Sequence, residues 1–237
     1  DHLPVTRVLH AEHCTVVHCD KEYFAENISI TENIDELWEC YETFSQNYSG
    51  MVFRGSYFTV KMLDYISNNL KCAVLRENGK IKAYVIYGEN NGGAVCEECI
   101  GFSSYLLCAL DFICKNVGNF SADLPPDTNL DMISGNTKIL SGALAGICNV
   151  SVLLAALKSN CPLTVNVTDK IIDGNNGTYS FNGMKTEKPA DIFMSAGGLV
   201  QLLFGYLAPS ELLCSRKNND ILEKYFSAKN CFTADLY

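Results

Sequence analysis

The chain has 237 residues, of which 48% are hydrophobic, and a formal net charge of −9 at neutral pH. Its length and apolar content allow a sizeable buried core, so we expect one or two folded domains and no extensive disorder. The negative charge argues against nucleic acid as a partner, because phosphate binding depends on Lys and Arg, and it makes cationic amines the more natural ligands.

No apolar run reaches the length of a membrane span, so we expect no membrane association and a cytoplasmic location. The 12 cysteines are spread through apolar runs, as small core residues are, and we expect them to be reduced thiols. The chain opens on Asp1 without a start signal, from which we expect an interior piece of a longer polypeptide.

The first segment, residues 5–20, is rich in β-branched residues and is predicted to form a strand or strand pair. It carries five possible zinc ligands, namely His10, His13, Cys14, His18 and Cys19, and Cys96 and Cys99 form a CxxC further on. In a strand His10, Cys14 and His18 share one face and the other two share the opposite face. A tetrahedral site needs four convergent ligands, so the pattern favours ordinary strand side chains over zinc.

Two amphipathic helices and a hairpin follow. Asn33 is placed to cap a helix over residues 34–44, and a second helix is predicted over residues 58–66. Residues 72–76 and 81–87 are predicted strands around Asn78-Gly79, which supplies the positive φ angles of a type I′ turn. A strand over residues 94–99 and a helix over residues 103–115 complete this half.

This order of strand, hairpin, strand and helix resembles the second half of a GNAT acetyltransferase domain. An active domain of that kind has a Gln/Arg-x-x-Gly-x-Gly/Ala loop before the helix, whose amides hold the coenzyme A pyrophosphate. This chain has Glu98-Cys-Ile-Gly-Phe-Ser-Ser104 there, without the basic residue or the second glycine. We expect Glu97 and Glu98 to repel phosphate, and therefore no cofactor to be bound by this chain.

Residues 122–129 break both periodicities and predict a boundary between domains 1–128 and 129–237. Gly142 and Gly146 lack the Lys-Ser/Thr of a P-loop and are interpreted as packing glycines. The remaining predicted elements are a short helix capped by Asn149, a hairpin of residues 163–168 and 178–181, a strand over residues 191–195, a helix through Leu199–Leu207 that Pro209 stops, a helix over residues 220–226 and an extended tail.

Five segments in order resemble the Eis-type (enhanced intracellular survival) acetyltransferases over nearly the whole chain. They are Tyr48-Ser-Gly-Met-Val-Phe-Arg54, Ala145-Gly-Ile-Cys-Asn-Val150, residues 163–169 with Asn175-Asn-Gly-Thr178, residues 199–213 and the tail Cys231-Phe-Thr-Ala-Asp-Leu-Tyr237. The resemblance implies an α+β fold: a degenerate GNAT-like mixed sheet with helices, lacking the acetyl-CoA loop, followed by a sterol-carrier-protein-like α/β domain.

The same resemblance implies a function that this chain would share with a further domain. The family's N-terminal GNAT domain binds acetyl-CoA and acetylates an amine substrate, and this sequence has no counterpart of its catalytic residues. The one catalytic position carried over is the terminal carboxylate of Tyr237, placed to orient or deprotonate the amine. We expect this chain alone to be inactive and to contribute a substrate cleft and homo-oligomer contacts. The alternative is a lipid-binding or other apolar-ligand module in the sterol-carrier-like domain.

Overall fold

The computed structural model describes residues 3–17, 24–90, 92–212 and 215–234, and divides the chain into two compact units. One unit, here the seven-stranded domain, comprises Arg7–Leu140 together with Phe232 and the residues that follow it. The other, here the three-stranded domain, comprises the residues up to Thr6 together with Ser141–Cys231. None of the helices in these ranges combines the length and hydrophobicity needed to cross a bilayer.

The seven-stranded domain is built on a mixed sheet with the strand order β3-β4-β5-β6-β7-β2-β8. Strands β6 and β7 run parallel, and the pairs β3–β4, β4–β5, β5–β6 and β7–β2 are antiparallel. Its elements are β2 (Arg7–Val16), β3 (Ala25–Ile28), α1 (Ile34–Ser45), α2 (Tyr57–Ser67), β4 (Lys71–Glu77), β5 (Lys80–Asn90), β6 (Gly93–Gly101), α3 (Ser103–Val117), β7 (Phe120–Leu124) and β8 (Ile133–Ser141).

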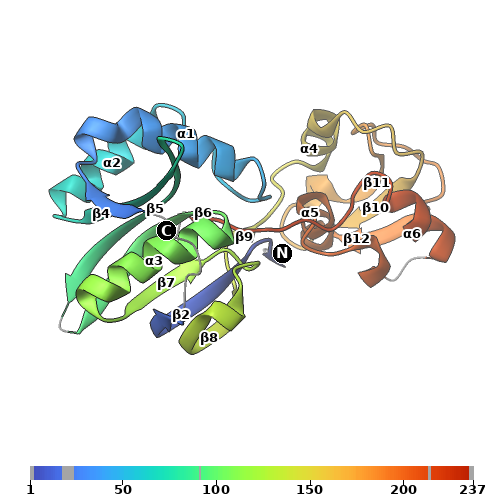
Figure 1. The fold of residues 1–237 in the computed structure, drawn as a ribbon. Coiled ribbons are helices and arrows are strands. Elements are labelled where there is room, and N and C mark those ends of the chain that lie inside the picture. Colours follow the sequence, from blue (N-terminus) through green and yellow to red (C-terminus); the bar gives the residue numbers. More distant parts are fainter. Residues whose placement is uncertain (1–2, 18–23, 91, 213–214, 235–237) are drawn as a thin grey trace. The chain divides into compact units, whose positions relative to one another are not determined.

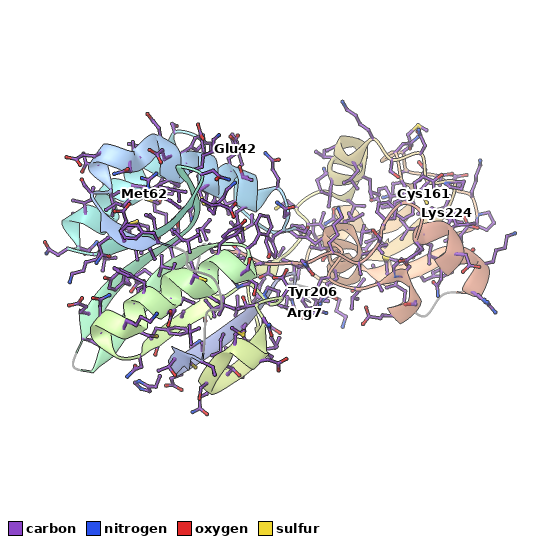
Figure 2. All side chains as sticks on the ribbon, in the orientation of Figure 1. Arg7, Glu42, Met62, Cys161, Tyr206 and Lys224 are labelled. Carbon is purple, nitrogen blue, oxygen red and sulfur yellow. The ribbon has the colours of Figure 1, made fainter. Side chains whose placement is uncertain are left out.

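Helices cover both faces of this sheet (Figure 1). Helices α1 and α2 pack on the face that carries Val74, Tyr84 and Ile86, and α3 packs on the face that carries Leu75 and Val85. The two cores are separate because successive strand residues point to opposite faces. Met62 of α2 is buried among the side chains between α2 and the sheet (Figure 2).

Two local predictions for this domain, a hairpin turn and a helix cap, have different outcomes. The hairpin turns at Asn78 and Gly79, with φ angles of 52° and 76°, as the type I′ prediction requires. The prediction for Asn33 is wrong, because its side chain makes no cap hydrogen bond. Its amide oxygen instead accepts a hydrogen bond from Arg76 at 2.9 Å.

The three-stranded domain is smaller, with the strand order β11-β10-β12. Strand β10 is antiparallel to β11 and parallel to β12, and helix α5 follows β12 directly. Its elements are β1 (Leu3–Pro4), β9 (Leu144–Ala145), α4 (Val150–Leu157), β10 (Thr164–Thr168), β11 (Gly177–Ser180), β12 (Ile192–Ser195), α5 (Ala196–Phe204) and α6 (Arg216–Leu222).

Several predictions for this second half are confirmed. Asn149 caps α4, because its side-chain oxygen accepts from the Val152 N–H at 3.0 Å. Gly142 is a packing glycine, since a Cβ there would lie 2.4 Å from the Thr6 hydroxyl oxygen. The hairpin of β10 and β11 forms as expected.

The bounds of two predicted helices differ from the structure. Helix α5 ends at Phe204, before Pro209, because Gly205 adopts a left-handed φ of 76° and closes the helix. Helix α6 begins at Arg216, with the Ser215 hydroxyl accepting from the Asn218 N–H. In both cases the capping residue, not the apolar pattern, sets the bound.

The division between the domains also lies later than the expected boundary at residue 128. The chain continues from β7 into β8, a strand of the seven-stranded sheet, and leaves this domain after Leu140. Apart from Ile133, every residue of β8 is exposed, so the segment lacks the alternating apolar pattern by which a strand is recognised.

Candidate functional site

The junction between β6 and α3 is where a GNAT-like domain would hold the cofactor pyrophosphate. Strand β6 ends at Gly101, Phe102 is the N-cap with extended backbone, and α3 begins at Ser103. Gly101 has a φ of 142°, and a Cβ there would lie 2.5 Å from the Cβ of Ala83 on β5. The glycine therefore permits a close strand-to-helix turn, and no basic side chain stands in the turn itself.

Glu98, at the first position of the expected loop pattern, does not face this turn. It is 2% exposed and forms two hydrogen bonds with the guanidinium of Arg54, at 2.9 and 2.6 Å. The hydroxyls of Tyr65 and Tyr84 donate to the same carboxylate at 3.0 and 2.5 Å, and the Lys61 ammonium lies 3.7 Å away. The prediction that Glu98 repels phosphate is wrong, because the carboxylate is buried and paired.

Arg54 is held in its charged form by its contacts with Glu98. Burial by itself lowers the pKa of Arg54, but the charge and hydrogen bonds of Glu98 outweigh it and raise that pKa. Burial and the same carboxylate raise the pKa of Tyr84 well above its usual value, so this phenol stays protonated and donates. The guanidinium also stacks 4.1 Å from the ring centroid of Tyr41. These charges satisfy one another and offer no free charge to a ligand.

A pocket of about 430 Å³ opens beside the Arg54–Glu98 cluster and is lined by residues of α2, β2, β6 and β7. Pairing between β6 and β7 stops at Cys96 and Ala122, and Glu97 forms a bulge in the register of β6 against β5. Acidic residues outnumber the ammonium groups in the pocket wall: it includes Asp64, Glu97 and Asp123 with one ammonium from Lys61. The other lining residues are His10, Tyr65, Val95, Cys96, Ser121, Ala122 and Ala234.

His10 and Asp123 form the one histidine–carboxylate pair in the described part of this wall. The imidazole Nδ1 lies 2.7 Å from a carboxylate oxygen of Asp123, on the neighbouring strand β7. Such a contact fixes the tautomer and orientation of the ring. Arg54 with Glu98 and His10 with Asp123 are pairs far apart in sequence, and the sequence analysis missed both.

A second pocket, of about 530 Å³, lies between α1, the β4–β5 turn and the start of α3. Lys80 and Lys82 line it, but so do Glu36 and Glu39, and the Lys80 ammonium lies 4.0 Å from Glu39. Phe102 and Tyr105 provide apolar wall. The balanced charges do not form a cationic cradle for a pyrophosphate.

The possible zinc ligands do not converge. Strand β2 has a bulge between Ala11 and Cys14, so both of these residues are buried in the core beneath α3, while His10 lines the pocket on the other face. The expectation that His10 and Cys14 share a face is therefore wrong. His18 and Cys19 lie outside the described residues. Within the described residues, no three His, Cys, Asp or Glu side chains are grouped to hold a metal ion.

The cysteines are mostly as expected. Nine of those described are free thiols, and burial raises the pKa of several of them, including Cys40 to about 12. Cys108 is the exception, because it is disulfide-bonded.

Tyr237, the predicted catalytic position, lies outside the described residues. The preceding tail is described as far as Ala234. The Phe232 side chain is 1% exposed in the core beneath α1 and α2, and its N–H donates to the Ser49 carbonyl oxygen at 3.0 Å. The tail is therefore anchored in the seven-stranded domain two residues before its described end.

Comparison with protein families finds one match: the sterol carrier protein domain, over residues 150–217. That range runs from the start of α4 into α6 in the three-stranded domain. No curated protein matches the sequence.

Solved structures resemble the whole chain. A conserved protein of Enterococcus faecalis V583, described as a probable N-acyltransferase, has a TM-score of 0.74 at 16% identity, over all of this chain and 68% of its own. A GCN5-related N-acetyltransferase from Anabaena variabilis has a TM-score of 0.70 at 14% identity, with 69% of its chain covered. Eis1 from Mycobacterium abscessus has a TM-score of 0.63 at 14% identity, with 70% covered.

These likenesses concern the fold. The chain has an α+β fold, with a GNAT-like mixed sheet and helices followed by a sterol-carrier-protein-like domain, as expected from the sequence. It spans between 68% and 70% of the length of the three proteins compared above, each of which is longer.

Proposed function

We propose that this chain is the non-catalytic part of an Eis-type N-acetyltransferase, which transfers an acetyl group from acetyl-CoA to an amine. An N-terminal GNAT domain of the same polypeptide would bind the cofactor and carry out the transfer. The present chain would provide part of the substrate cleft, contacts of a homo-oligomer and the terminal carboxylate of Tyr237.

The β6–α3 junction is the observation that carries this proposal. The amides of a phosphate-binding loop must be free and its surroundings cationic or neutral. Here Gly101 packs closely against Ala83, and the buried Glu98 stands where the loop's basic residue would be. Arg54 forms two hydrogen bonds with that carboxylate. The GNAT-like sheet therefore serves as a scaffold, and the transfer chemistry belongs to another domain.

The acidic pocket supports an amine as the substrate class. Asp64, Glu97 and Asp123 line one concave surface, and an ammonium group gains from several carboxylates with few competing cations. Lys61 is the one cationic neighbour among the described lining residues besides the titratable His10, and it is drawn toward Glu98.

Acetylation assays of two proteins test this proposal: the chain alone, and the same chain preceded by its native upstream sequence. We expect acetyl transfer to a primary amine from the longer protein and none from the chain alone. Deleting Tyr237 from the longer protein should lower kcat by about 100-fold or more, as loss of a general base or a positioned carboxylate does. Acetyl transfer by the chain alone would contradict the proposal.

A second candidate is supported by the match to the sterol carrier protein domain: binding of a lipid or another apolar ligand in the three-stranded domain. The fully buried residues of α5, Leu199 and Leu202, pack into one cluster with Val165, Val167 and Phe181. This dense cluster favours a solid core over a ligand tunnel. Native mass spectrometry after incubation with fatty acids and sterols tests the candidate, and a stoichiometric complex would support it.

A further inference from the structure

The tail occupies a place in the seven-stranded domain where the sheet leaves room for it. Strand β6 pairs with β7 only from Ala94 to Cys96, although β6 continues to Gly101 and β7 to Leu124. Phe232 packs in one core cluster with Ile100, which lies in the part of β6 that pairs with β5 but not with β7. Ala234 shares the acidic pocket with Cys96 and Ala122. Thr233, between Phe232 and Ala234, is 3% exposed.

The socket for Phe232 is built by groups outside the tail. The ring lies 5.8 Å from the centroid of Tyr48 and 6.2 Å from that of Phe44, both in edge-to-face geometry. The Tyr48 hydroxyl donates to both carboxylate oxygens of Asp127, at 2.8 and 3.0 Å. This bond joins the segment after α1 to the segment after β7, so the aromatic wall of the socket is fixed independently of the tail.

The covalent connection between the tail and the rest of the seven-stranded domain runs through the three-stranded domain. The chain leaves after Leu140, forms the whole of Ser141–Cys231 as a separate unit, and returns at Phe232. No strand of the seven-stranded sheet comes from the tail as far as Ala234, where its description ends. The described tail contributes a backbone hydrogen bond from Phe232, the buried ring of Phe232, the buried Thr233 and the partly buried Ala234. Contacts of these kinds are those by which extended peptides bind to grooves.

We propose that Phe44, Tyr48 and Ile100, together with the pocket that Tyr65 lines, form a peptide-binding groove, and that residues 232–234 are its separable ligand. It recognises an extended segment with an aromatic residue followed by two small residues. The groove's use in holding the carboxylate of Tyr237 rests on the proposed function, whereas peptide binding itself does not.

A labelled peptide tests this in the full chain. The peptide spans residues 229–237, and the full chain carries Phe232→Ala to weaken its own tail. By fluorescence polarisation, we expect saturable binding to this variant and at least 10-fold weaker binding to the wild type, whose groove is filled. A peptide with the same Phe→Ala change should bind about 100-fold more weakly, the scale expected for loss of a fully buried aromatic ring. The matched control is Phe193→Ala in the full chain, because Phe193 is 74% exposed, and it should bind the peptide no better than the wild type.

Hydrogen exchange of the wild-type chain gives a reading that needs no variant. If the tail is separable, it opens without global unfolding. The amides of residues 232–234 should then exchange at least 100-fold faster than those of β4 and β5. Equal protection of the tail and these strands, or no saturable peptide binding to a folded Phe232→Ala chain, would overturn the proposal. A wild-type dimer that Phe232→Ala dissociates would also overturn it, by assigning the tail to a second copy. Lack of acetyltransferase activity in the longer protein would leave these results unchanged and count only against the proposed function.

Discussion

The buried pair of Arg54 and Glu98 is the most consequential side-chain contact of the seven-stranded domain. Both side chains are fully inaccessible, and the carboxylate also accepts from two tyrosine hydroxyls. Desolvating two charges is costly, and the pair offsets that cost only while both partners are present. The pair therefore fixes the relative position of α1, α2 and β6 more than it adds to stability.

Removing one partner tests this role. We expect Arg54→Met to lower the free energy of unfolding by about 3 to 5 kcal/mol, because it leaves the buried carboxyl group of Glu98 without its ion-pair partner. The double variant Arg54→Met/Glu98→Leu should recover much of that loss. Urea denaturation measures both values, and a double variant as unstable as the single one would contradict this account. Lys71→Met is a control, since Lys71 and its partner Glu89 are both exposed and such pairs contribute little.

Asp169 makes a pH-dependent contribution in the three-stranded domain. The Asn175 side chain, followed by the backbone N–H groups of Ile171 and Ile172, donates to it and lowers the pKa of Asp169 to about 2. A lowered pKa in the folded state stabilises the fold above the unfolded value near 3.8, and this contribution is lost as the pH falls toward 2.

Comparison of the wild type with Asp169→Asn isolates the contribution of the Asp169 carboxylate to the free energy of unfolding. We expect the difference in unfolding free energy between wild type and variant to be constant above about pH 5 and to shrink steadily from pH 4 to pH 2. Chemical denaturation at a series of pH values measures it. A difference that grows on acidification would have the wrong sign for a carboxylate of lowered pKa.

At the scale of elements, the tight turn from β6 into α3 depends on Gly101. A methyl group there meets Ala83 at 2.5 Å and the backbone has a φ of 142°, so both packing and conformation oppose a side chain. We expect Gly101→Ala to destabilise the domain by about 3 kcal/mol. Gly79→Ala, at a φ of 76° with nothing within 4 Å, should cost only about 1 kcal/mol. Equal losses of stability for the two variants in thermal unfolding would show that Ala83 can move aside and that the turn is not tightly packed.

The elements were predictable where the signal is local. The apolar faces of α1, α2 and α3 repeat with helical spacing, and the β4–β5 hairpin carries Asn78-Gly79, so sequence alone placed them. Strand β8 was not recognised because its exposed residues have no reason to alternate. The bulges in β2 and β6 were also missed, and they decide which face His10 and Glu98 occupy. A bulge depends on the partner strand, which the local sequence does not specify.

For the whole molecule, the expected fold class holds, whereas the candidate site could be predicted only in part. The Gln/Arg-x-x-Gly-x-Gly/Ala comparison located the β6–α3 junction, since that motif is contiguous. The pairing of Arg54 with Glu98, 44 residues apart, and of His10 with Asp123, 113 residues apart, follows from sheet order and could not be derived from local patterns. The same holds for Phe232, whose socket is assembled from segments distant in the chain.

The most direct measurement for the central proposal is calorimetric titration of acetyl-CoA into the purified 237-residue chain. The β6–α3 junction has a glycine packed against Ala83, a buried carboxylate and no cationic side chain in the turn. We therefore predict no binding heat at micromolar to high micromolar concentrations of acetyl-CoA. The longer protein, with its upstream sequence, serves as the positive control and should bind. Saturable micromolar binding to the chain alone would contradict the assignment of this domain as a scaffold without a cofactor.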